Sequence, residues 1–63
     1  MSQDRYQLDR SKDGGAHVER YNKQRQNVGR YKLDKTPIKH KGKYPPPVPK
    51  SDYEKFDAAA GMA

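Results

Sequence analysis

The sequence predicts a mostly irregular chain, intrinsically disordered when free, that on binding becomes an extended chain with one or two short α-helices and a polyproline II segment. The large aliphatic and phenylalanine side chains number seven in 63 residues, well under the roughly 20% that a globular domain carries. Charged residues make up 35% of the chain and the net charge is +6, as in segments that stay disordered. Cysteine is absent, so neither disulfides nor a cysteine-based zinc site can replace the missing core.

Charge divides the chain into three segments, none of which is expected to be an independent globular domain. Residues 1–19 form a mixed-charge N-terminal segment with three basic and four acidic residues, a net charge of −1. Residues 20–50 form a basic arm with ten basic residues and one acidic residue, a net charge of +9. Residues 51–63 hold one basic and three acidic residues, a net charge of −2. The positive field is therefore concentrated in the arm.

The first predicted helix covers about residues 16–28. Val18, Tyr21, Arg25 and Val28 recur there at helical spacing and would share one face. A helix of this length is marginal in water by itself. We therefore expect it to form only when it docks on a partner.

The basic arm ends in a proline-rich extended segment, residues 44–50. Four prolines within five residues fix the backbone as polyproline II, because proline locks φ and lacks an amide hydrogen. From Lys43 to Pro49 the residues also fit the pattern cation-x-x-Pro-x-x-Pro that SH3 domains bind. The segment is thus either a stiff spacer or a ligand for an SH3-type domain.

The second predicted helix, about residues 52–60, has a clear start signal. Ser51 and Glu54 have the spacing of a capping box, in which each side chain accepts from the backbone amide of the other residue. Tyr53 and Phe56 would then share one face as anchors. This pattern predicts a short C-terminal docking helix.

No catalytic, metal or cofactor site is predicted, nor a small-molecule substrate. Catalytic groups must be held rigidly in a pocket, and a chain without a core cannot hold them. His17 and His40 are 23 residues apart, and neither has a companion ligand at metal-binding spacing. The sequence therefore predicts a protein that is not an enzyme.

The basic arm predicts a nucleic-acid-binding segment, with RNA or a ribonucleoprotein particle of the ribosome-associated type as partner. Lysine and arginine would contact phosphates, and the interleaved tyrosines would stack on bases. Such a protein would be a small structural or accessory component of a large assembly. The residues assigned to this role are Arg20, Tyr21, Lys23, Arg25, Arg30, Tyr31, Lys32, Lys35, Lys39, Lys41, Lys43 and Tyr44.

Three other functions remain open. The eight acidic residues favour an extended protein–protein staple in a filament, a virion or a multisubunit complex. An SH3-type ligand and a hydrophilic protectant without a specific partner are the others. Other protein subunits would bind Pro45, Pro46, Pro47, Pro49, Tyr53 and Phe56.

Location follows from the lack of apolar runs. No stretch is long and apolar enough to span a bilayer, and the N-terminus lacks the pattern of a signal peptide. We therefore expect a cytoplasmic protein, with the nucleus, a virion or an organelle matrix as alternatives.

Overall fold

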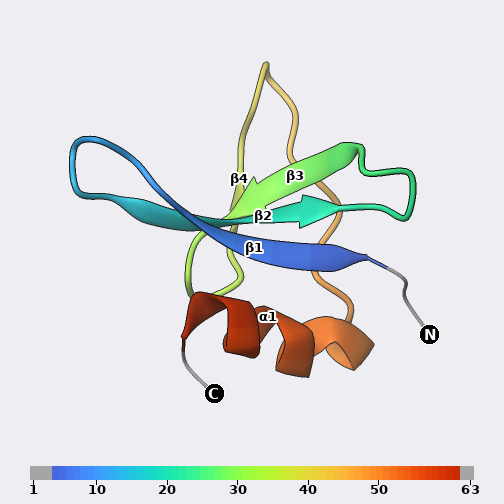
Figure 1. Ribbon diagram of the computed structural model, residues 1–63. Helices are drawn as coiled ribbons and strands as arrows, with labels where there is room; N and C mark the ends of the chain where they lie inside the picture. The colour runs from blue at the N-terminus through green and yellow to red at the C-terminus, as the bar shows by residue number, and fades with distance from the viewer. Residues whose placement is uncertain (1–3, 62–63) are drawn as a thin grey trace.

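Three successive β-hairpins build the sheet, and a C-terminal helix packs on one of its faces (Figure 1). The computed structural model describes residues 4–61. All pairs in the sheet are antiparallel, and its strand order is β1-β2-β3-β4. The strands are β1 (Arg5–Arg10), β2 (Ala16–Tyr21), β3 (Asn27–Tyr31) and β4 (Pro37–Ile38), followed by the 3₁₀ turn η1 (Lys50–Asp52) and α1 (Tyr53–Ala60). Among the described residues, no helix is long and apolar enough to cross a membrane.

The three hairpin turns, at residues 11–15, 22–26 and 32–36, share one local geometry. In each, the amide of the first residue donates to the carbonyl of the fifth, at 2.8, 3.0 and 2.8 Å. A side-chain oxygen of Asp13, Asn22 or Asp34 accepts a further backbone amide inside its turn, as these residue types do in turns. Local turn chemistry therefore sets the register of each hairpin.

The core lies between the helix and one face of the sheet. Val18, Tyr31, Val48 and Phe56 are buried, and Tyr6 packs against them. The Phe56 ring lies 5.6 Å from the Tyr6 ring and 6.2 Å from the Tyr31 ring, edge-on in both cases, an arrangement that aromatic pairs favour. Phe56 thus ties α1 to both β1 and β3.

Both core tyrosines have hydrogen-bonded hydroxyl groups. Tyr6 donates to Oδ2 of Asp52 at 2.6 Å, and Asp52 is only 1% exposed. Tyr31 donates to the carbonyl of Pro46 at 2.5 Å. Burial, together with the hydrogen bond to Asp52, raises the pKa of Tyr6 far above its ordinary value of 10.0. The two tyrosine rings therefore contribute buried apolar surface to the core, and each hydroxyl group has a hydrogen-bond partner.

The proline-rich segment packs directly on β3. A Cβ atom built on Gly29 would lie 2.2 Å from Cβ of Pro45, so only glycine permits this approach. Further along, Val48 reaches the core and is 6% exposed. The segment therefore connects the sheet to η1 as a packed part of the domain.

The predicted disordered fold class is wrong. The chain forms a compact four-stranded antiparallel sheet with a short helix. Counting only aliphatic and phenylalanine side chains missed Tyr6 and Tyr31, and no partner is needed to cover Phe56. Hairpins closed by their own turn residues add local order that composition does not measure.

The predicted helix over residues 16–28 is also wrong, because these residues form β2, a turn and β3. His17, Glu19 and Tyr21 lie on one face of β2, and Val18 and Arg20 lie on the other. This period of two is the pattern of a strand, and it decides which side chains face the core once the strands pair. A C-terminal helix does form, but Asp52 is its N-cap residue and makes no side-chain capping bond. The capping box predicted at Ser51 and Glu54 is therefore absent, and the Asp52 carboxylate binds Tyr6 instead.

Replacing Tyr6 by phenylalanine should destabilise the fold by about 1.5 to 3 kcal/mol, because it leaves the buried Asp52 carboxylate without its donor. Urea denaturation measures this loss. Tyr21→Phe, which removes a hydroxyl bound to Glu19 at 3.1 Å on the open face, is the matched control and should cost less than about 1 kcal/mol. Equal losses for both variants would contradict a special role for the Tyr6 hydroxyl.

Tyr6→Phe should also make the free energy of unfolding fall less steeply as the pH rises into the alkaline range. The raised pKa of Tyr6 means that its contribution is fully present below pH 10.0, the ordinary tyrosine pKa, and is lost as the pH rises above it. The same urea titrations at a series of alkaline pH values compare the two slopes. An unchanged slope in the variant would show that Tyr6 ionisation does not oppose folding.

We expect Gly29→Ala to destabilise the protein by about 1 to 3 kcal/mol, as overpacking does, because the new methyl group meets the rigid Pro45 ring. Gly15→Ala is the control, because its nearest neighbour is the flexible Ser11 hydroxyl at 3.1 Å. Thermal unfolding followed by circular dichroism measures both. A neutral Gly29→Ala variant would mean that the proline-rich segment does not pack on β3.

Candidate nucleic-acid interface

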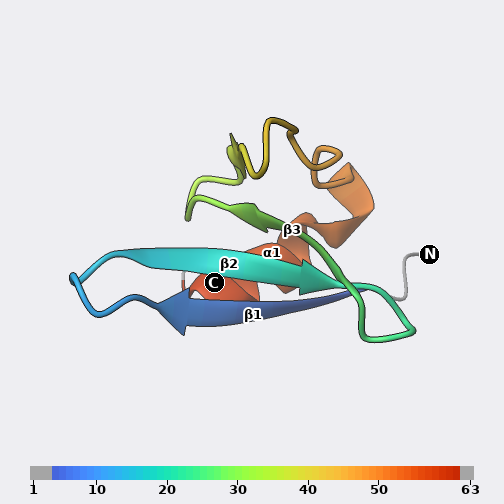
Figure 2. The same cartoon turned by 90° about the horizontal axis from the view of Figure 1, so that it is seen from above.

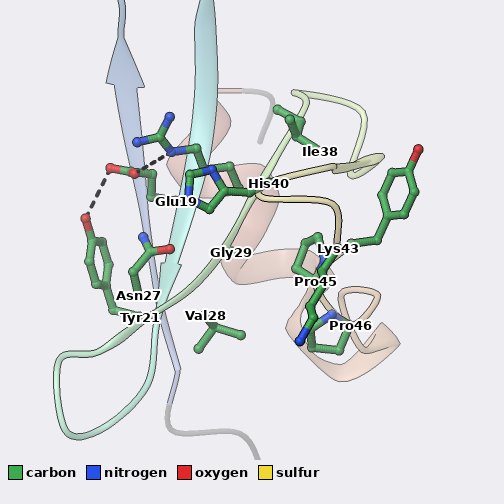
Figure 3. A pocket seen from close by; sticks show the side chains of 12 residues that line it. Glu19, Tyr21, Asn27, Val28, Gly29, Ile38, His40, Lys43, Pro45 and Pro46 are labelled. Atoms are coloured by element: carbon green, nitrogen blue, oxygen red, sulfur yellow. Dashed lines mark hydrogen bonds and ion pairs between the residues drawn. The ribbon is translucent and has the colours of Figure 1, made fainter.

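A hollow of about 640 Å³ lies between β3 and the loop that follows β4 (Figure 3). Glu19, Tyr21 and Arg30 line it from β2 and β3. The opposite wall includes His40, Lys43, Tyr44, Pro45 and Pro46. We call this hollow the Tyr44 groove.

A tight turn positions the cationic wall of the groove. His40 and Lys43 exchange backbone hydrogen bonds of 2.7 and 3.0 Å around Lys41 and Gly42. Both central residues have positive φ, 51° and 78°, as a two-residue hairpin turn requires. The turn holds Lys43 beside Tyr44, which is 67% exposed and is the most exposed of the large hydrophobic residues described.

Glu19 organises the wall formed by the sheet. Its Oε1 accepts a hydrogen bond from Nε of Arg30 at 3.0 Å, and its Oε2 accepts one from the Tyr21 hydroxyl at 3.1 Å (Figure 3). Glu19 is 13% exposed at its side chain, whereas Arg30 is 50% exposed. The carboxylate is therefore neutralised by a cation whose guanidinium still reaches solvent.

A His-carboxylate cluster lies on the same face of the sheet. One ligand atom each from Asp9, His17 and Glu19 lies within 4.8 Å of the others. Nε2 of His17 is buried without a hydrogen bond of good geometry, although Oδ2 of Asp9 is 3.4 Å away. These are the described residues that could hold a metal ion, but Arg30 already supplies a positive charge to Glu19. The cluster is therefore a group of neighbouring polar side chains in which Glu19 is already paired with Arg30.

Strand pairing created this cluster, and the sequence analysis missed it. Asp9 lies directly opposite His17 in the β1–β2 ladder, and Glu19 is two residues further along β2. The alternation of residues 17, 19 and 21 is the signal that could have found their common face. The spacing between the two histidines carried no such information.

The structure brings together part of the predicted nucleic-acid set. Tyr21, Arg30, Lys43 and Tyr44 line the Tyr44 groove. Other members lie elsewhere on the surface, and all of them are exposed: Lys23 and Arg25 in the β2–β3 turn, Lys32 in the β3–β4 turn, Lys39 just before the tight turn and Lys41 within it.

Three members of that set have structural roles instead. Tyr31 is 0% exposed, so its ring is not available for stacking in this conformation. Arg20 binds Asp4 through Nε at 2.5 Å. Lys35 lies 2.7 Å from Oδ1 of Asp57, with its ammonium group 4.8 Å from the centre of a tyrosine ring in α1.

The residues predicted to bind protein subunits are mostly used inside the domain. Phe56 is buried in the core, and Pro45 packs on Gly29. The Pro46 carbonyl accepts the hydroxyl of a core tyrosine. In contrast, Tyr53 is 41% exposed. The remaining two residues, Pro47 and Pro49, are exposed and half-buried, respectively.

Lys41→Gly should stabilise the domain by about 1 kcal/mol, because a side chain in the left-handed region is strained and glycine is not. Lys39→Gly is the matched control outside the left-handed turn and should be neutral or destabilising. Thermal unfolding of the two variants gives the comparison. A destabilised Lys41→Gly variant would contradict the left-handed conformation of Lys41.

Comparison with known proteins gives no match: no protein-family model, curated protein or solved structure is significantly similar to this chain.

Proposed function

We propose that the chain is a small, non-catalytic RNA-binding component of a ribonucleoprotein, and that the Tyr44 groove holds a single-stranded segment. The observation that carries this proposal is the exposed Tyr44 ring at the rim of a groove that also presents Lys43 and Arg30. An aromatic face for a base, with cations for the adjacent phosphates, is the usual pairing in single-strand binding.

Each groove residue has a definite part in this proposal. Tyr44 stacks on an unpaired base, which requires a single strand because paired bases are already stacked. Lys43 and the exposed guanidinium of Arg30 contact phosphate oxygens. Glu19, held by Arg30 and Tyr21, would orient the arginine.

A second hollow extends the path of the strand. It has a volume of about 390 Å³ and is lined by Arg5 and Arg25, among others. Tyr21 lines both this hollow and the Tyr44 groove. A strand that crosses Tyr21 would therefore meet cations on both sides, which favours contact with several successive phosphates.

Fluorescence anisotropy with labelled single-stranded RNA tests the proposal. We expect the affinity to fall steeply between about 50 and 200 mM salt. Tyr44→Ala should weaken binding by about 10-fold through lost stacking, and Lys43→Gln should reduce the salt slope by about one.

Lys12→Gln is the control for charge alone. It removes the same unit of charge in the β1–β2 turn, which lies apart from the loop after β4 (Figure 1). Equal losses for Lys12→Gln and Lys43→Gln would show non-specific attraction and contradict the groove. Equal binding of single-stranded DNA would remove the assignment to RNA, and no binding at low salt would exclude the proposal.

A further inference from the structure

The two edges of the sheet differ in how they are protected from further pairing. The β4 edge is two residues long and contains Pro37, which has no amide hydrogen to donate. The β1 edge is six residues long, contains no proline and pairs without a register shift to β2. In the part of the chain that the structure describes, no segment lies along the outer side of β1 (Figure 2). A strand of this kind is open to pairing with another strand.

The turn after β1 determines which backbone groups face outward. The Ser11 amide donates to the Gly15 carbonyl, and hydrogen-bonded positions alternate along an antiparallel pair. Every second residue before Ser11 therefore bonds to β2. The residues between them, including Tyr6 and Leu8, direct their amides and carbonyls away from the sheet.

We propose that β1 pairs with β1 of a second copy of this chain, antiparallel and about a two-fold axis through Gln7. In this register, Tyr6 of each copy exchanges backbone hydrogen bonds with Leu8 of the other. Both side chains lie on the helix-covered face and are partly buried against the core. The pair would extend that core across the axis and satisfy the outward backbone groups.

Charge complementarity between the two β1 strands favours a second copy as the partner and favours this register. On the opposite face, Arg5 of one copy stands across from Asp9 of the other, twice in the symmetric pair. Asp9 is 49% exposed at its side chain, so it can accept a further cation. Arg5 has no ion pair within residues 4–61 and lines a hollow with two other cations, Lys23 and Arg25. An acidic group from a partner would offset the charge of Arg5 within this cluster, while Arg25 and the Tyr44 groove would still be available to RNA.

The neighbouring registers lack this complementarity. An axis through Tyr6 would place Arg5 opposite Gln7, and an axis through Leu8 would place Arg5 opposite Ser11. Cross-strand pairs of opposite charge stabilise a sheet and like charges destabilise it. The register centred on Gln7 is therefore favoured over both.

The proposed dimer rests on β1 and does not depend on RNA binding. Its two-fold axis would be perpendicular to the sheet, so the Tyr44 grooves of both copies would open on the same side. Two grooves on one particle would allow one RNA to bind both. The association itself can be measured without any RNA.

Sedimentation equilibrium over a range of concentrations tests the dimer in the full chain. We expect a species of twice the 7.3 kDa monomer mass. Either Arg5→Asp or Asp9→Arg should weaken the association by about 10-fold, because each change creates two like-charge pairs across the axis. The double variant Arg5→Asp with Asp9→Arg should recover most of the wild-type affinity. Circular dichroism checks that each variant is folded.

Two outcomes would overturn the proposal. One is a monomer at every concentration up to the millimolar range. The other is a dimer whose affinity the single charge changes leave untouched or the double variant fails to restore, because either result places the contact elsewhere. Hydrogen exchange adds an independent readout, since the Tyr6 and Leu8 amides should become protected as the dimer forms.

Discussion

The packing of Phe56 between Tyr6 and Tyr31 is the contact on which the rest of the structure depends. It is the place where α1, β1 and β3 meet, and the Phe56 ring contacts each tyrosine ring edge-on. A sheet of short hairpins is marginal unless one face is covered. The aliphatic side chains are few, and Phe56 and the two tyrosines are the largest side chains of the core.

The hydroxyl groups of the two tyrosines extend this contact into the connecting segment. Tyr6 holds Asp52 at the start of α1, and Tyr31 holds the Pro46 carbonyl. Gly29 lets Pro45, the residue before Pro46, approach β3 closely. The proline-rich segment is thereby attached at several points, and its position determines where the loop carrying the cationic wall of the groove stands. The core and the Tyr44 groove are therefore coupled through the same backbone.

Several local features could be predicted from the sequence, whereas the fold class could not. The C-terminal helix and its end at Gly61, which has a φ of 76°, follow from local signals. The helix predicted over residues 16–28 was wrong because the prediction rested on four residues at helical spacing. It ignored the alternation of residues 17 to 21 between two faces, which is typical of a strand. Disorder was the wrong conclusion because the count of core side chains was limited to aliphatic and phenylalanine residues, although Tyr31 is fully buried.

The sequence by itself determined the basic charge of residues 20–50 and the end of the C-terminal helix at Gly61, since these depend on residue type and near neighbours. Only the tertiary structure decided which cations face solvent. Arg20 and Lys35 belong to the same basic arm as Arg30 and Lys43, yet the first two are held in ion pairs with Asp4 and Asp57. The physical reason is that strand pairing and helix docking bring together residues far apart in the chain, and no local pattern encodes those distances.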